Sequence, residues 1–261
     1  MIKEVKRIVV KVGTSSLTYQ TGKLNIRRIR KLGEVLSDLL NSGVQVALVS
    51  SGAIGVGTSK LGLSARPTDT PGRQAAATVG QCELMFMYDK VFSEFGHTVG
   101  QLLITRSDVE NDERRENLIN CFEKLFEYGA IPIINENDTI ATEEIVIGDN
   151  DTLGALVAKL VNADLLILLS DIEGLYSADP RTEKNAKLID KVYKITDEIK
   201  ALASGKGTNL ATGGMVTKIQ AAEICMDAGI PMVIANGENP DNIYGIIEGK
   251  NIGTRFAPEG K

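Results

Sequence analysis

The chain has 261 residues, which is long for one domain, yet α/β folds of this length often form one continuous core, and we predict a single domain. A net charge of −5 at pH 7, with no long block of lysine and arginine, argues against a surface that binds nucleic acid. One histidine, His97, and three cysteines without a CxxC pair argue against a zinc site or a disulfide framework, so catalysis must rely on lysines, carboxylates and backbone groups.

Strand and helix patterns alternate along the sequence. In chain order we predict a strand at 8–12, a helix at 26–40, a strand at 44–49, a helix at 72–95, a strand at 99–104, a helix at 107–128, a strand at 131–134, a helix at 150–162, a strand at 165–169, a helix at 214–228, a strand at 232–235 and a helix at 240–247. The strand runs are almost continuously apolar, which is typical of a parallel sheet covered on both faces. The series is that of an α/β protein.

No apolar run approaches the ~20 residues that a membrane span needs, and the N-terminal apolar run is too short for a signal peptide. We therefore expect a soluble, cytoplasmic protein. His97 follows Phe95-Gly96 just before an apolar run, and we predict a turn or strand-edge residue rather than a catalyst.

Small and polar residues follow five of the six predicted strands. They are Lys11-Val12-Gly13, Ser50-Ser51-Gly52, Asn135-Glu136-Asn137-Asp138, Ser170-Asp171 and Asn236-Gly237. Loops are polar in any protein, but glycine, serine and amide residues rather than lysine and glutamate favour a binding site. In an open parallel sheet, ligands bind at the carboxyl ends of the strands, so we predict a long polar cleft at that edge.

Two lysines lie in glycine-rich turns, at Lys11–Ser15 and Thr212–Lys218, and Asp151 lies between them in the sequence. Backbone N–H groups in such turns bind anions, and two lysines oriented by a carboxylate can move a phosphoryl group. The sequence lacks the GxxxxGK[ST] loop, and Lys60 stands where a dinucleotide fingerprint would have its third glycine. Neither a P-loop ATPase nor a Rossmann dehydrogenase is indicated.

Seven motifs, in order along nearly the whole chain, resemble the amino acid kinase family and, within it, the glutamate 5-kinases. They are Lys11–Ser15, Ser50–Ile54, Gln74–Gln81, Asn135–Asp138, Gly148–Asp151, Asp171–Arg181 and Thr212–Lys218. The resemblance implies a three-layer αβα sandwich with a mainly parallel central sheet, the carbamate kinase-like fold. It also implies ATP-dependent phosphorylation of the γ-carboxylate of L-glutamate, the first step of proline biosynthesis.

A side-chain carboxylate as nucleophile is ionised at neutral pH, with an unperturbed pKa of about 4.3, and needs no general base. The enzyme must instead overcome its repulsion from ATP with fixed cations. By resemblance, Lys11 and Lys218 supply these cations and Asp151 holds both. The nucleotide contacts that the resemblance implies are Lys11, Gly13, Ser170, Asp171, Thr212, Gly213, Gly214, Met215, Val216, Thr217 and Lys218.

Three positions match the family's glutamate site: Ser51, Asp138 and Asn150. Asp138 can pair with an ammonium group, and Ser51 and Asn150 can donate to carboxylate oxygens, although all three could equally cap loops. Mg²⁺ should accompany the β- and γ-phosphates of ATP, because it prefers oxygen ligands and keeps several waters. The sequence shows no dedicated carboxylate cage for it. An N-acetylglutamate kinase or aspartokinase is the nearest alternative, and a catalytically idle nucleotide-binding regulatory subunit is another.

The resemblance implies a substrate-binding part at about 1–160 and a nucleotide-binding part at about 161–261. From the sequence we also predict that residues 184–206, in which Val192–Ile195 is followed by a short polar helix, form an excursion near the nucleotide. It also implies feedback inhibition by L-proline, a homo-oligomer (a dimer or tetramer) and transfer of the product to a glutamyl phosphate reductase. The sequence resembles the short form of the family, without the C-terminal PUA domain.

Overall fold

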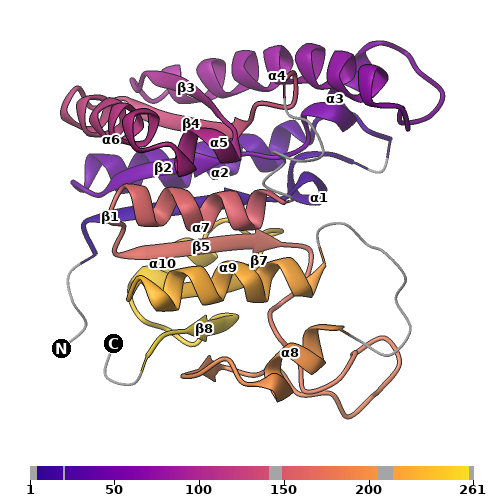
Figure 1. Ribbon diagram of the computed structural model, residues 1–261, viewed down its shortest axis with the longest axis vertical. Helices are drawn as coiled ribbons and strands as arrows, with labels where there is room; N and C mark the ends of the chain where they lie inside the picture. Colours follow the sequence, from indigo (N-terminus) through magenta and orange to yellow (C-terminus); the bar gives the residue numbers. More distant parts are fainter. Residues whose placement is uncertain (1–4, 20, 141–148, 205–213, 259–261) are drawn as a thin grey trace.

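The computed structural model describes residues 5–19, 21–140, 149–204 and 214–258 (Figure 1). The strands are β1 (Arg7–Val12), β2 (Gln45–Val49), β3 (Val99–Ile104), β4 (Ile131–Glu136), β5 (Leu165–Ser170), β6 (Lys191–Val192), β7 (Met232–Asn236) and β8 (Thr254–Phe256). The helices are α1 (Thr14–Leu17), α2 (Ile26–Asn41), α3 (Ala53–Lys60), α4 (Thr70–Ser93), α5 (Arg106–Glu110), α6 (Asp112–Glu127), α7 (Asn150–Leu160), α8 (Asp197–Ser204), α9 (Met215–Asp227) and α10 (Asn242–Ile247).

The strands form one sheet in the order β3-β4-β2-β1-β5-β7-β8-β6. Its only antiparallel pairing among the described residues is that of β7 with β8. β1 lies inside the sheet and pairs on one side with β2 and on the other with β5, so that Val9 lies opposite both Ala47 and Leu166. β1 therefore joins strands from the two halves of the chain.

Helices cover both faces of the sheet because successive side chains of each strand point to opposite faces. On β1, Ile8 and Val10 pack into a core with α2, α4 and α10, whereas Val9 packs into a second core with α6, α7 and α9. In Figure 1, α7 and α9 run side by side across the near face of the sheet. The three-layer αβα sandwich with a mainly parallel sheet is confirmed.

Eleven of the twelve predicted elements are present as single elements, and the predicted single helix at 107–128 is wrong. The interval 107–128 is split into α5 and α6, because Asn111 is extended (φ −78°, ψ 125°) and its side chain caps α6 by accepting from the N–H of Arg114. The sequence prediction also lacked α1, α3, β6 and β8. The short helix expected within 184–206 is α8.

The small residues of the Gln74–Gln81 motif bring α4 unusually close to α3. A Cβ atom on Gly57 of α3 would lie 1.7 Å from the carbonyl oxygen of Ala76, and one on Gly80 would lie 1.8 Å from that of Ala53. Only glycine permits this backbone approach. The contact fixes α4 beside α3, and the first residue of α3, Ala53, lies two positions after Ser51 in the chain.

Two further features concern the outside of the fold. Within the described segments, every helix is too short or too polar to cross a bilayer. A cavity of about 970 Å³ lies at the amino ends of β5 and β7, where Leu165, Pro231 and Arg255 line it. It is therefore at the opposite edge of the sheet from the carboxyl ends of these strands.

Candidate active site

Lys11 is placed by β1 at the centre of the sheet. Because side chains alternate along the strand, Lys11 points to the same face as Val9, towards α7 and α9. Gly154 of α7 leaves room there: a Cβ atom on it would lie 3.4 Å from Cβ of Lys11. Lys11 is 6% exposed, so its ammonium group requires a charged partner.

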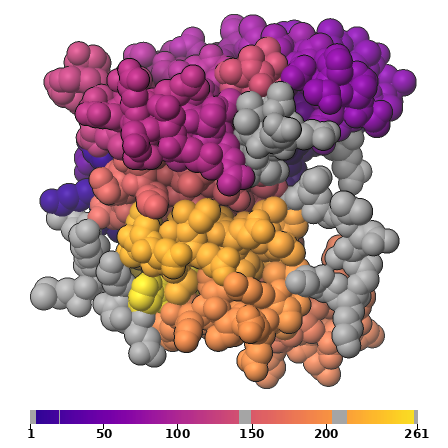
Figure 2. All heavy atoms as spheres, viewed as in Figure 1, coloured from indigo at the N-terminus to yellow at the C-terminus, as the bar shows by residue number. Residues whose placement is uncertain are grey.

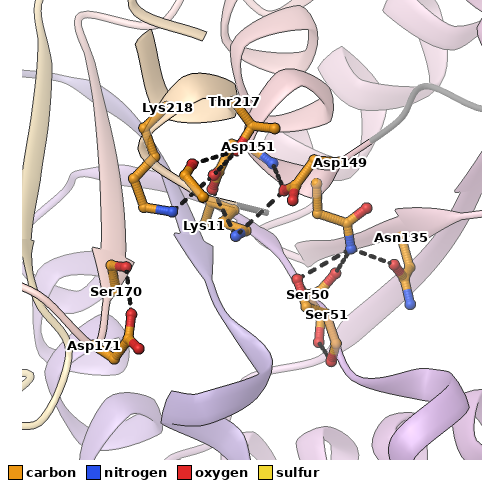
Figure 3. A network of polar contacts seen from close by, with 12 residues as sticks. Lys11, Ser50, Ser51, Asn135, Asp149, Asp151, Ser170, Asp171, Thr217 and Lys218 are labelled. Atoms are coloured by element: carbon orange, nitrogen blue, oxygen red, sulfur yellow. Dashed lines mark hydrogen bonds and ion pairs between the residues drawn. The ribbon is translucent and has the colours of Figure 1, made fainter. Parts of the chain in front are cut away.

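Asp151 is that partner, and it contacts both predicted lysines (Figure 3). Its Oδ1 lies 2.6 Å from Nζ of Lys11, and its Oδ2 accepts a 3.0 Å hydrogen bond from Nζ of Lys218. The carboxylate is 1% exposed. Burial opposes ionisation, but the attraction of the two ammonium groups outweighs it and holds the pKa of Asp151 below its ordinary value.

The start of α7 orients this carboxylate. Asp149 is the N-cap residue, and its Oδ1 accepts a 2.8 Å hydrogen bond from the N–H of Asp151. The same Oδ1 lies 3.9 Å from Nζ of Lys11. Asp149 thus fixes the first turn of α7 and adds negative charge beside Lys11.

Lys218 comes from the start of α9, where Gly214 is the N-cap residue and no side chain caps the helix. The first turn carries no acidic residue, so the backbone N–H groups near Met215 and Val216 can bind an anion. Thr217 Oγ1 lies 3.0 Å from Asp151 Oδ2 and 2.8 Å from the carbonyl oxygen of Gly214. Lys218 itself is 5% exposed.

A second polar group lies at the carboxyl ends of β2 and β4. Asn150 Nδ2 lies within hydrogen-bond distance of three acceptors: the carbonyl oxygen of Ser50 at 2.6 Å, Oγ of Ser51 at 3.1 Å and Oδ1 of Asn135 at 2.9 Å. Its two N–H groups are therefore engaged by the protein. This differs from the expectation that Asn150 donates to a carboxylate, because its amide oxygen is the group that remains for a ligand.

Asp138 follows β4 and is half-buried. Burial raises the pKa of this carboxyl group above its ordinary value of 3.8, although the positive charges of Arg73 and Arg66 oppose the shift. A cationic ligand would stabilise the ionised form of a half-buried carboxylate at this end of the strands through a charge-assisted hydrogen bond.

Ser170 and Asp171 lie at the end of β5, next to β1 in the sheet. Ser170 Oγ donates a 3.1 Å hydrogen bond to Oδ1 of Asp171. The N–H of Gly13 donates to the carbonyl oxygen of Leu169 at 3.2 Å and ties the turn after β1 to β5. In Figure 3, Ser170 and Asp171 lie on one side of the lysines, and Ser50, Ser51 and Asn135 lie on the other.

The structure therefore brings Lys11, Asp151 and Lys218 into direct contact, and Ser51 with Asn150. It also places Gly13, Ser170, Asp171, Asp138 and Gly214–Thr217 at the ends of the same strands or at the start of α9. Thr212 and Gly213 lie outside the described residues. The described residues contain no group of three or more His, Cys, Asp or Glu side chains that could hold a metal ion.

Sequence reasoning did not assign roles to Ser50, Gln81, Asn135 and Asp149. Ser50 and Asn135 directly adjoin predicted strand ends, and that position could have identified them. Gln81 is the last residue of the Gln74–Gln81 motif, which supports the resemblance but gives Gln81 no role of its own. Its role comes from a contact in the fold: Asn135 Nδ2 donates to Gln81 Oε1 at 2.8 Å.

Comparisons with known proteins show the family and the fold of the chain. A glutamate 5-kinase of Clostridium perfringens (strain 13 / Type A) is 52% identical over 98% of this chain and 96% of its own length, and one of Listeria monocytogenes serovar 1/2a is 54% identical over 98% and 94%. Among solved structures, the UMP kinase of Bacillus anthracis (TM-score 0.67, 16% identity, 99% of this chain and 98% of its own) and an isopentenyl phosphate kinase of T. acidophilum (TM-score 0.66, 19% identity, 96% and 100%) share the fold. The amino acid kinase family is matched over residues 6–236, and the chain belongs to that family.

Proposed function

We propose that the chain is an ATP-dependent kinase that phosphorylates the γ-carboxylate of L-glutamate and releases L-glutamyl 5-phosphate and ADP. The observation that carries the proposal is the buried contact of Asp151 with Lys11 and Lys218. Relatives at 52% and 54% identity that are named glutamate 5-kinase support the choice of substrate.

The reaction joins two anions. A carboxylate oxygen of glutamate attacks the γ-phosphorus of ATP, the bond to the β,γ-bridging oxygen breaks, and that oxygen leaves with ADP. Lys11 and Lys218 are proposed to contact the transferred and leaving oxygens, where negative charge would otherwise keep the reactants apart. Asp151 would keep both ammonium groups aimed at the phosphates and limit their mutual repulsion.

The nucleotide is proposed to lie over Ser170, Asp171 and the start of α9, with its phosphates at Gly13 and at the N–H groups of residues 214–217. Thr212 and Gly213 are expected to complete this contact. Mg²⁺ is proposed to arrive with ATP and to be held mainly by phosphate oxygens and water, since it retains waters and binds few protein carboxylates in such sites. Its chemistry would be the neutralisation of phosphate charge.

The amino acid is proposed to bind between Ser51, Asn150 and Asp138. An ammonium group gains a charge-assisted bond from Asp138, whereas the blocked amide of an N-acetylated substrate gains little. This favours a free amino acid over N-acetylglutamate.

The test is trapping of the product as a hydroxamate with hydroxylamine, which distinguishes carboxyl phosphorylation from ATP hydrolysis. We expect hydroxamate with L-glutamate and much less with L-aspartate or N-acetyl-L-glutamate. Equal or faster reaction with either competitor would refute the substrate assignment. Absence of hydroxamate with every amino acid would instead favour an idle binding subunit, and an unchanged rate in Lys218→Ala would refute the role of Lys218.

We also propose, from the family resemblance, cytoplasmic location, inhibition by L-proline, a homo-oligomeric state and delivery of the unstable acyl phosphate to a reductase. Activity measured with and without L-proline tests the inhibition, and dilution-dependent light scattering tests the homo-oligomeric state.

A further inference from the structure

Gln81 of α4 lies directly behind the second polar group. It is 8% exposed, and its Oε1 accepts a 2.8 Å hydrogen bond from Nδ2 of Asn135 on β4. The glycine contacts hold α4, which carries Gln81, close to α3. Gln81, Asn135 and Asn150 form a series of side-chain amides, which we call the amide relay.

Backbone groups fix the orientation of each amide in this relay. The carbonyl oxygen of Ser50 can only accept, so Asn150 must present Nδ2 to it at 2.6 Å. The N–H of Glu136 can only donate, so Asn135 must present Oδ1 to it at 2.9 Å. Asn135 Oδ1 then also accepts from Asn150, and Asn135 Nδ2 is left facing Gln81, which must present Oε1.

Gln81 occupies its place at a cost. Its Nε2 is buried and has no hydrogen-bond partner among the described residues. An apolar side chain at this position would avoid that cost, but it would leave Asn135 Nδ2 without its hydrogen-bond partner instead. A buried side chain that leaves one of its own polar groups unpaired while it completes a polar network at a ligand site is expected where function requires it.

We propose that Gln81 is a positioning residue that holds Asn135, and through it Asn150, so that Asn150 presents Oδ1 to the ammonium group of the amino acid. The proposal rests on the proposed function, because it takes a free amino acid as the ligand. Asp138 supplies the charge for that ammonium group, and the amide relay supplies a neutral acceptor of fixed direction. Gln81 thereby contributes to the choice of amino-acid substrate without contacting that substrate.

The test compares Gln81→Met, which keeps the size and removes the acceptor, with Gln81→Glu, which keeps an oxygen at the same place. Gln81→Met should raise KM for L-glutamate about tenfold, which corresponds to about 1.4 kcal/mol and is the scale of one lost hydrogen bond, and it should change KM for ATP less than twofold. Gln81→Glu should restore most of the glutamate affinity. Val91→Ala, a buried apolar change on the same helix, should lower Tm and leave both KM values unchanged.

An unchanged KM for glutamate in Gln81→Met, or equal increases for both substrates, would overturn the proposal. A second readout does not depend on the substrate: the side-chain N–H signals of Asn150, assigned by their loss in Asn150→Asp, should exchange slowly with solvent in the wild type and faster in Gln81→Met. If the wild type fails to phosphorylate glutamate, the proposed function falls, and unchanged exchange in Gln81→Met would separately refute the relay.

Discussion

Of all substitutions in the site, we expect those of Asp151 to have the largest effect on stability and activity, because its carboxylate pairs with two buried ammonium groups. In Asp151→Asn these groups remain buried without a counter-charge. We expect the free energy of unfolding to fall by about 3–5 kcal/mol and kcat to fall about 100-fold or more. Urea unfolding and steady-state kinetics measure the two effects.

The same residue predicts a dependence of stability on pH. Because the pKa of Asp151 is lowered in the folded state, its contribution is present above its ordinary value of 3.8 and is lost as pH falls through the lowered pKa. The stability difference between wild type and Asp151→Asn should therefore narrow in acid. Asp179→Asn, which removes an exposed pair with Arg181, is the control and should cause no measurable change. A difference that stays constant into acid would contradict the assignment.

Asp138 predicts a separate acid limb in catalysis. Burial raises the pKa of Asp138, so it loses its charge, and with it the ammonium contact, at a higher pH than an exposed aspartate does. We expect kcat/KM for glutamate to fall on acidification above pH 3.8 in the wild type. In Asp138→Asn, kcat/KM should be lower throughout and the acid limb should be less steep, because the substrate carboxylate, with an unperturbed pKa of about 4.3, is then the one group of this pair that still titrates. A limb with the same steepness in Asp138→Asn would assign it to another group.

At the scale of elements, the contact between α3 and α4 links packing to substrate binding. Gly57→Ala would place a methyl group against the carbonyl oxygen of Ala76, so we expect a loss of about 1–3 kcal/mol in the free energy of unfolding. Displacement of α4 would also move Gln81, and KM for glutamate should rise.

Gly55→Ala is a matched control on the same helix. Its new Cβ would meet only Thr14 Cγ2, at 3.9 Å, and should add about 0.5–1 kcal/mol of stability through lower backbone entropy in the unfolded chain. Equal effects of the two substitutions on thermal unfolding would show that the helix contact is not the cause.

The sequence predicted the elements whose patterns are strong. Five of the six predicted strands are almost wholly buried apolar runs, whereas β3, at the edge of the sheet, exposes Gln101 and Leu103. In α2, buried apolar residues recur every three to four positions. α3 was beyond reach because its glycines lower helix propensity, and only packing against α4 explains them. β6 and β8 are too short for a pattern, since two- and three-residue strands depend on their neighbours.

Some features of the candidate site could likewise be predicted from the sequence, and others could not. Lys11, Asp151 and Lys218 could be predicted because their motifs are local and their chemistry is distinctive. The direction of the Asn150 amide could not, since it depends on the carbonyl oxygen of Ser50, which is 100 residues away in the chain. Spatial neighbours of this kind leave no local signal.

At the scale of the molecule, the sheet order separates β3, β4 and β2 from β5, β7, β8 and β6, with β1 between them. On the face shown in Figure 2, α9 lies between the N-terminal half above and residues of the 165–204 region below. The predicted division into a glutamate part and a nucleotide part follows this line, and it stays a prediction.

Hydrogen exchange with single ligands tests that division. A non-hydrolysable ATP analogue with Mg²⁺ should slow exchange at the ends of β5 and β7 and at the start of α9. L-Glutamate alone should slow exchange at residues 50–56 and 135–138. Protection of the N-terminal part by the ATP analogue alone would refute the division.

The central place of β1 has a consequence for biosynthesis. Ile8, Val9 and Val10 emerge from the ribosome early, yet their partners on one side, Leu165 to Ile167 of β5, follow more than 150 residues later. Pairing across such a separation is slow to form because the intervening chain must first be closed into a loop. The nascent chain must therefore carry an apolar, half-paired β1 until most of the chain has been translated, and this interval is when the protein is most exposed to aggregation.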